Sequence, residues 1–267
     1  MIHLADIDLG VKKAINEIID VASSSSPDGF VAYIAGGEYY KCFENTKLLP
    51  YVLEGVLDFR KDLSRQEFYV HYMNMNYKTD GFAYEGEKGI DYLTVELLIY
   101  VHLWQSNYFL KHLVRLAHLA CGKDYDWDLD VKENIRNYLN ENVIDPLSEK
   151  GLMIGQLIKD CYYPVIRDSF AHGLYSIDKS SRVIDLYGRR ASGPISFEEF
   201  QRKFLYSIFL SQNLFTSYRE NQKLMAGFLS EKDVSLFLPD GNRIKVESEI
   251  KVFDNEEYYI FRPILLP

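Results

Sequence analysis

Cysteine is scarce in this chain, and its scarcity excludes two kinds of cross-link. The three cysteines, Cys42, Cys121 and Cys161, are odd in number and widely spaced. This spacing supports neither a disulfide framework nor a CxxC pair of the kind that holds zinc. We expect neither a metal nor another cofactor in this chain.

Long apolar runs and a leader segment are missing as well. No run reaches the roughly 18 residues that a membrane-spanning helix needs. The N-terminus, Met1–Asp8, has no basic region followed by an apolar core, which a secretory signal would require. The sequence predicts a soluble, cytoplasmic protein that has no membrane partner.

Positive charge is in deficit. The chain has 30 lysines and arginines against 39 acidic residues, a net charge of −9. A broad, sequence-blind nucleic-acid-binding surface would need an excess of cations, so this balance argues against one. A local basic site remains compatible with it.

Apolar and aromatic residues, in contrast, are plentiful. Of 267 residues, 47% are hydrophobic, and 21 are tyrosine and 16 phenylalanine, enough for a full core. Helical spacing dominates the centre of the chain. We predict a mainly α protein in three parts: an N-terminal α+β region of unknown role (1–89), a helical bundle (90–228), and a small C-terminal β-meander packed on the bundle (229–267).

The local sequence patterns in the first part (1–89) are less regular than those in the other two parts. The predicted elements are a helix over 8–22, a turn over Ser23–Gly29, a strand pair or irregular segment over Phe30–Phe43, a short helix over Leu48–Phe59, a strand over Phe68–Tyr77 and a turn over Lys78–Gly81.

The rest of the chain has clearer signals. An apolar stripe predicts one long helix over Ile90–Ala120 that ends at Gly122, and Ser196 with Glu199 forms a capping box that begins another. The remaining predicted elements are an acidic loop over Lys123–Asp130, a helix over Val131–Leu147, a hairpin of Leu174–Ile177 with Val183–Tyr187, and a meander of Val234–Leu238, Arg243–Val252 and Tyr258–Phe261.

The stretch Leu157–Tyr175 gathers three polar groups near the end of an amphipathic helix. Arg167, Asp168 and His172 lie off its apolar face, and Gly173 supplies a left-handed position that stops the helix. Pro164 predicts a kink just before them. Asp168 and His172 are four residues apart, so the carboxylate is expected to fix the imidazole tautomer. Arg167 and His172 lie roughly 140° apart around an ideal helix, so a distorted last turn or a second copy must bring them together.

Arg167–His172 fits Arg-x4-His with a polar residue after the arginine, and in this it resembles the motif of the HEPN superfamily of helical proteins. The resemblance covers roughly Asp91–Phe228. It implies a HEPN-like bundle, a homodimer through the motif helix, and metal-independent endoribonuclease activity in a toxin or phage-defence system, with an antitoxin or other regulatory protein as a further partner. The implied catalytic residues are Arg167, Asp168 and His172, with RNA as substrate.

The chemistry of such a site follows from the side chains. RNA carries its own nucleophile, so cleavage needs a base, for which neutral His172 is suited. It also needs a cation at the phosphate, for which the forked guanidinium of Arg167 is suited. The basic residues Arg182, Arg189 and Arg190 are candidates for binding the RNA backbone.

A structural interpretation of the same residues stays open. Arg167 and Asp168 would form a surface ion pair, His172 would favour the negative end of the helix dipole, and the basic residues would be a solvated face. The alternative function is a non-catalytic HEPN-like module for RNA binding or dimerisation. His102, His112 and His118 do not share a helical face, so we interpret them as core or surface histidines.

Overall fold

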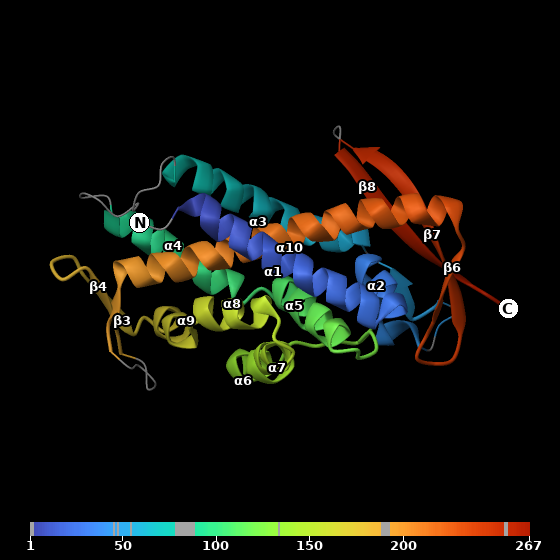
Figure 1. The fold of residues 1–267 in the computed structure, drawn as a ribbon, viewed down its shortest axis with the longest axis horizontal. Coiled ribbons are helices and arrows are strands. Elements are labelled where there is room, and N and C mark those ends of the chain that lie inside the picture. The colour runs from blue at the N-terminus through green and yellow to red at the C-terminus, as the bar shows by residue number, and fades with distance from the viewer. Residues whose placement is uncertain are drawn as a thin grey trace.

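The structure is a computed structural model, and it describes residues 3–44, 46, 48–53, 55–77, 89–132, 134–187, 193–253 and 256–267. The predicted mainly α class is confirmed (Figure 1). The α-helices are α1 (Leu4–Ser25), α2 (Pro27–Ile34), α3 (Gly55–Asn76), α4 (Gly89–Leu103), α5 (Asn107–Ala120), α6 (Ile135–Leu139), α7 (Asp145–Glu149), α8 (Met153–Cys161), α9 (Pro164–Ala171) and α10 (Phe197–Glu231).

The strands form three small antiparallel sheets with the orders β1-β2, β3-β4-β5 and β6-β7-β8. The last sheet is the predicted C-terminal meander. The strands are β1 (Gly37–Tyr39), β2 (Tyr51–Leu53), β3 (Tyr175–Asp178), β4 (Val183–Leu186), β5 (Ile195–Ser196), β6 (Val234–Phe237), β7 (Arg243–Phe253) and β8 (Glu256–Leu265). A 3-10 turn, η1 (Lys41–Phe43), follows β1, and a π-helical segment, η2 (Asn140–Ile144), joins α6 to α7.

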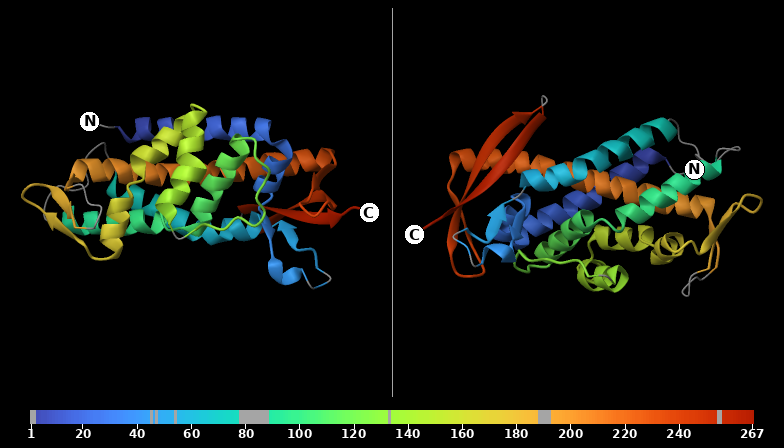
Figure 2. Two further views of the ribbon diagram at one scale, coloured as in Figure 1. Left: turned by 90° about the horizontal axis from the view of Figure 1, so that it is seen from below. Right: turned by 180° about the vertical axis from the view of Figure 1, so that it is seen from behind.

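Helix α10 is the longest element of the described residues, and several other elements pack against it. It contacts α1, α4 and α8 along the bundle and β7 near its C-terminal end. Figure 1 shows the β6–β8 sheet at one end of the long axis and the β3–β4 hairpin at the other. In the view from behind in Figure 2, α3 and α4 run along the length of the bundle. This arrangement sets α9 and β3 at the end of the molecule opposite to α2 and β6.

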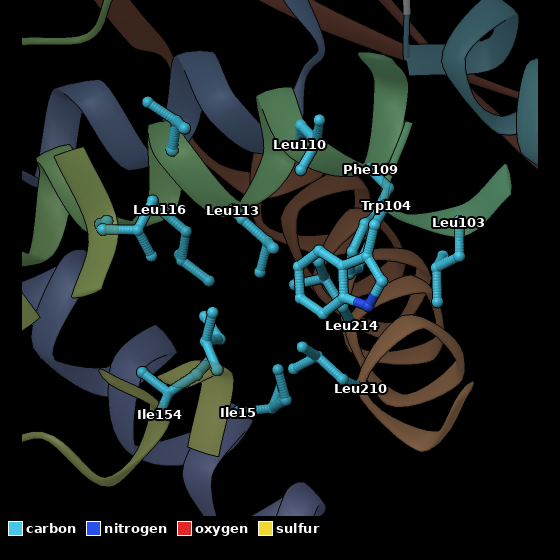
Figure 3. Packing of buried hydrophobic residues seen from close by; sticks show 14 of the residues in the cluster. Ile15, Leu103, Trp104, Phe109, Leu110, Leu113, Leu116, Ile154, Leu210 and Leu214 are labelled. Carbon is cyan, nitrogen blue, oxygen red and sulfur yellow. The ribbon is translucent and has the colours of Figure 1, made fainter. Parts of the chain in front are cut away.

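One continuous core joins the predicted parts of the chain. Helix α1, in the first 89 residues, packs against both α5 and α10. Trp104 is fully buried, and its indole N–H donates to Ser207 Oγ on α10 at 3.0 Å. Figure 3 shows the indole beside Leu113 and Leu214. The core therefore does not divide at residue 89.

Two predictions for the first part are wrong. Phe68–Tyr77 is not a strand, since all of it except Tyr77 forms the last turns of α3. The buried side chains there (Tyr69, Tyr72, Met73) follow helical spacing, whereas the alternating Phe68 and Val70 are about half exposed. Leu48–Phe59 is not one helix. It contains β2, which pairs with β1, and then the start of α3.

The neighbouring segments differ as well. The expected turn over Ser23–Gly29 shrinks to Ser26 between α1 and α2, because Pro27 takes the first position of a new helix, where it loses no hydrogen bond. Most of Phe30–Phe43 continues as α2 and β1, and β1 pairs with β2 rather than within the segment. The expected turn over Lys78–Gly81 lies outside the described residues.

The helix expected over Ile90–Ala120 is two helices. The chain breaks at Trp104–Ser106, and Ser106 Oγ caps α5 by accepting from the Phe109 amide at 3.4 Å. The apolar stripe continues across the break, so the spacing of the apolar residues did not indicate that the helix is interrupted.

The helix 8–22 and the α10 cap are confirmed, since α1 spans Leu4–Ser25 and the Glu199 amide donates to Ser196 Oγ. The predicted hairpin is β3 with β4, and Val131–Leu147 corresponds to α6, η2 and α7.

Gly122 has a φ of +74° and ends α5 as predicted. None of the helices in the described residues is both long enough and apolar enough to cross a bilayer.

Candidate functional site

The polar cluster lies on α9, which a break of two residues separates from α8. The expected kink at Pro164 is thus a full interruption. Tyr163, before the proline, is extended at φ −122° and ψ 95°, as the proline ring requires of its neighbour. Pro164 then takes the first position of α9. The sequence therefore starts a new short helix instead of bending one long helix.

Tyr100 of α4 holds this break together. Its hydroxyl donates to the Cys161 carbonyl at 2.8 Å and accepts from the Tyr163 amide at 2.7 Å. Lys203 of α10 adds a bond to the Asp160 carbonyl at 2.9 Å. These contacts satisfy backbone groups that the break leaves without helical partners. Tyr100 has no signature in the sequence, because it lies among the apolar residues of α4.

Helix α9 ends at the glycine that the sequence predicts would stop it. Gly173 has a φ of +65°. Its amide donates to the Phe170 carbonyl at 3.1 Å, and the Leu174 amide donates to the Ser169 carbonyl at 2.7 Å. These are the two bonds of a Schellman motif. His172 is therefore the last residue before the chain turns away, and its side chain is exposed.

Arg167 and Asp168 form a pair of their own. Arg167 Nε and Nη2 donate to Asp168 Oδ1 at 3.0 and 2.7 Å. The side chain of Arg167 is 18% exposed and that of Asp168 is 43% exposed, so both can be reached from solvent.

The predicted contact between Asp168 and His172 is not made. Their link is through the backbone, from the His172 amide to the Asp168 carbonyl at 3.2 Å. The charged guanidinium of Arg167 attracts the carboxylate strongly through two charge-assisted hydrogen bonds. Because His172 has left helical geometry, with φ −102° and ψ 5°, Asp168 orients Arg167 and not the imidazole.

Two buried hydroxyls lie in and next to this helix. Tyr162 and Ser169 are 5% and 0% exposed, and within the described part of the chain neither hydroxyl has a hydrogen-bond partner. Burial raises the pKa of Tyr162 to about 12, and the nearby Arg167 opposes that shift. Tyr162 therefore stays protonated at neutral pH and does not serve as a base there.

The predicted RNA-binding arginines are described only in part. Arg182 lies in the turn after β3, and Nη2 donates to Glu198 Oε1 at 2.9 Å. Its guanidinium also lies over the ring of Phe197, 5.6 Å from the centroid. Arg189 and Arg190 lie outside the described residues. The structure thus gives Arg182 an acidic partner.

A second titratable cluster was missed at the level of sequence. Glu96 of α4 is fully buried and accepts hydrogen bonds from the hydroxyls of Tyr72 at 3.2 Å and Tyr77 at 2.5 Å. Burial raises the pKa of Glu96 to about 8, and the two tyrosines oppose that shift. The sequence signal for this cluster was a glutamate placed directly before Leu97, in an otherwise apolar stretch. Because Glu96 is enclosed, we assign it to the core.

The histidines of α4 and α5 do not form a metal site. His112 Nδ1 lies 3.1 Å from the Tyr33 hydroxyl, and His118 Nε2 lies 3.2 Å from Asn142 Oδ1. Among the residues that the structure describes, no three histidine, cysteine or acidic side chains are arranged to hold a metal ion.

Comparison with family models, with curated proteins and with solved structures gives no match for this chain. The HEPN resemblance therefore stays a prediction from the Arg167–His172 motif.

Proposed function

We propose that this chain is a metal-independent endoribonuclease that uses Arg167 and His172. The observation that carries the proposal is the exposed imidazole of His172 at the end of α9, one turn beyond a solvent-accessible Arg167. The resemblance to the HEPN motif supplies the reaction class, and a role as a toxin or phage-defence effector rests on that resemblance alone.

The reaction needs few protein groups. His172 takes the proton of the RNA 2′-hydroxyl, which attacks the adjacent phosphorus, and the 5′-oxygen leaves. Arg167 stabilises the charge on the phosphate oxygens. The products are a 2′,3′-cyclic phosphate and a 5′-hydroxyl.

A homodimer is part of the proposal. One imidazole acts as base, and the leaving oxygen needs an acid. A second copy of α9 would supply another His172. The short α9, broken off from α8 by Pro164 and exposed at its end, suits pairing of two motif helices across a twofold axis.

The test incubates the purified protein with assorted RNAs in EDTA, alongside Arg167→Ala and His172→Ala. Positioned acid–base catalysis contributes about 10²–10⁴-fold, so His172→Ala should lose at least the lower factor. Arg202→Ala and His102→Ala remove an exposed arginine and an exposed histidine elsewhere and should leave cleavage unchanged. Cleavage that survives either site substitution, or that the controls lose equally, would overturn the proposal.

One observation favours the alternative, a non-catalytic RNA-binding or dimerisation module. The guanidinium of Arg167 is neutralised by Asp168, as an ordinary ion pair would be. For that module the same experiment gives RNA that is retained but intact, with chain ends unchanged.

A further inference from the structure

A cavity of about 490 Å³ lies at the end of the molecule opposite to α9. Its aromatic lining comes from β1, β2 and the loop after α5, through Tyr39, Tyr51, Tyr125 and Trp127. The volume is in the range of small-molecule sites. The RNA-cleavage proposal does not involve this cavity.

The loop after α5 forms one wall of the cavity, and in it buried aromatic residues alternate with aspartates. Tyr125 and Trp127 are 8% and 5% exposed and pack inward, whereas Asp124 and Asp128 are exposed. Gly37 makes room for the two rings, because an added Cβ there would lie 2.8 Å from the Trp127 ring and 2.9 Å from that of Tyr125. The Tyr125 hydroxyl donates to the Gly37 carbonyl at 2.6 Å, which fixes the loop against β1.

The rings stand at steep angles to one another. Trp127 meets Tyr51 at 83°, with centroids 5.4 Å apart, and Tyr125 at 87°, with centroids 5.3 Å apart. Tyr39 lies 5.0 Å from Tyr51. Tyr51, Tyr125 and Trp127 are mostly buried against one another, at 8%, 8% and 5% exposure, so each presents only a small part of its ring to the cavity. These parts face the cavity in several orientations, an arrangement that suits a rounded cation rather than a flat ring.

The charges of the lining favour a cation. Asp124, Asp126 and Asp128 line the cavity, against Lys123 as the basic side chain. His118 also lines it, and burial, with help from Lys123, lowers the pKa of His118, so this ring is neutral at pH 7. Arg115 lies over the Tyr125 ring at 5.0 Å, but its charge is met by Glu38 at 2.8 Å.

The carboxylates are spread out rather than convergent. Within the described ranges no group of them is placed to hold a metal ion. A neighbouring cavity of about 400 Å³ shares Asp124, Tyr125, Trp127 and Pro239 with the first and adds Asp28. The combined site is larger and more acidic than a single inorganic ion requires.

We propose that the cavity lined by Tyr39, Tyr51 and Trp127 binds a small organic cation of the quaternary or methylated ammonium class. The cation's methyl groups contact the aromatic rings, and the carboxylates of Asp124 and Asp128 at the rim neutralise its charge. A neutral molecule of the same shape keeps the apolar contacts but loses the attraction to the rings and to the carboxylates.

The test compares choline with its neutral carbon isostere, 3,3-dimethyl-1-butanol, at constant ionic strength set by potassium chloride. Binding is followed by tryptophan fluorescence and by calorimetry. The chain has two tryptophans, and Trp104 is enclosed in the core, so a fluorescence change reports on Trp127. We expect saturable choline binding with a Kd below about 1 mM and isostere binding roughly tenfold weaker.

Asp124→Asn and Asp128→Asn should each weaken choline binding by about threefold to tenfold. The matched control is Asp130→Asn, an exposed aspartate of the same loop that does not line the cavity, and it should bind like the original. Circular dichroism checks that each variant is folded. No saturation by choline, equal binding of the isostere, or an equal loss in Asp130→Asn would each overturn the proposal.

Discussion

The guanidinium of Arg167 donates two hydrogen bonds to the same oxygen of Asp168, at 3.0 and 2.7 Å. A phosphate that binds Arg167 must therefore compete with, or share the guanidinium with, a carboxylate that is already there. The pair also leaves the imidazole of His172 without help from Asp168. This geometry makes Asp168 a positioning residue for Arg167.

Asp168→Asn should strengthen RNA binding. The substitution removes a negative charge from a partly exposed pair, which is worth about 0.2–1 kcal/mol, so affinity should rise by about 1.4-fold to fivefold in a filter-binding assay. The pH profile of any cleavage should stay unchanged, because the carboxylate does not contact His172.

Asp160→Asn is the matched control, since Asp160 is an exposed aspartate on α8 whose side chain accepts from Gln156. It should leave RNA affinity unchanged. A fall in cleavage with a shifted pH profile in Asp168→Asn would instead favour the tautomer-fixing role expected from the four-residue spacing.

Tyr100→Phe should destabilise the protein by about 1–3 kcal/mol. It removes the hydroxyl that hydrogen-bonds to both the Cys161 carbonyl and the Tyr163 amide. Buried backbone groups that lose their hydrogen-bond partner lower the free energy of unfolding by this amount. Tyr162→Phe is the control, because the Tyr162 hydroxyl is buried without a partner in the described residues. It should be neutral or stabilising. Urea denaturation measures both, and equal losses would contradict this account of the break.

Sequence patterns correctly predicted those features that depend only on a few neighbouring residues. Gly173 and the Ser196 cap act within a few residues of chain, so their patterns determine the turn and the helix start wherever the chain packs. The break between α4 and α5 was not predictable in the same way. Trp104 continues the apolar stripe across the break, and this obscured the local signal there, which is the Ser106 side chain that caps α5.

The placement of the three candidate residues was predictable, but their pairings were not. Arg167, Asp168 and His172 are found together at a helix end, as the spacing indicated. Which partner Asp168 takes depends on the exact end of α9, and Tyr100 lies about sixty residues away in sequence, beyond the reach of any local pattern. The strand expected over Phe68–Tyr77 failed because an aromatic-rich segment satisfies two periods at once.

Gly173→Ala should lower stability by about 1 kcal/mol. An added Cβ at this position meets nothing within 4 Å, so the cost is that of holding a non-glycine residue at φ +65°. Gly10→Ala is a matched test of the opposite sign. Gly10 lies inside α1, also with open space around its Cβ, so alanine should add about 0.5–1 kcal/mol by helix propensity. Thermal denaturation of the two variants separates these effects, and a loss at both positions would show that crowding, not conformation, decides.

Glu96 should make stability fall as pH rises. Its pKa is about 8 in the folded protein because of burial, against 4.5 when exposed. Between these values the unfolded chain has released the proton and the folded chain has kept it, so the unfolded state binds fewer protons and raising the pH favours unfolding. The contribution approaches about 1.4 kcal/mol per pH unit within that window and levels off above pH 8.

Glu96→Gln removes the titration but keeps an oxygen that accepts from Tyr72 and Tyr77. The difference in unfolding free energy between the original protein and Glu96→Gln should therefore shift in favour of the variant as pH rises from 5 to 8, measured by urea denaturation at each pH. Glu149→Gln, on an exposed glutamate of α7, should show no such trend. A difference that is flat with pH would mean that Glu96 already carries its charge in the folded core, with the two tyrosines compensating for its burial.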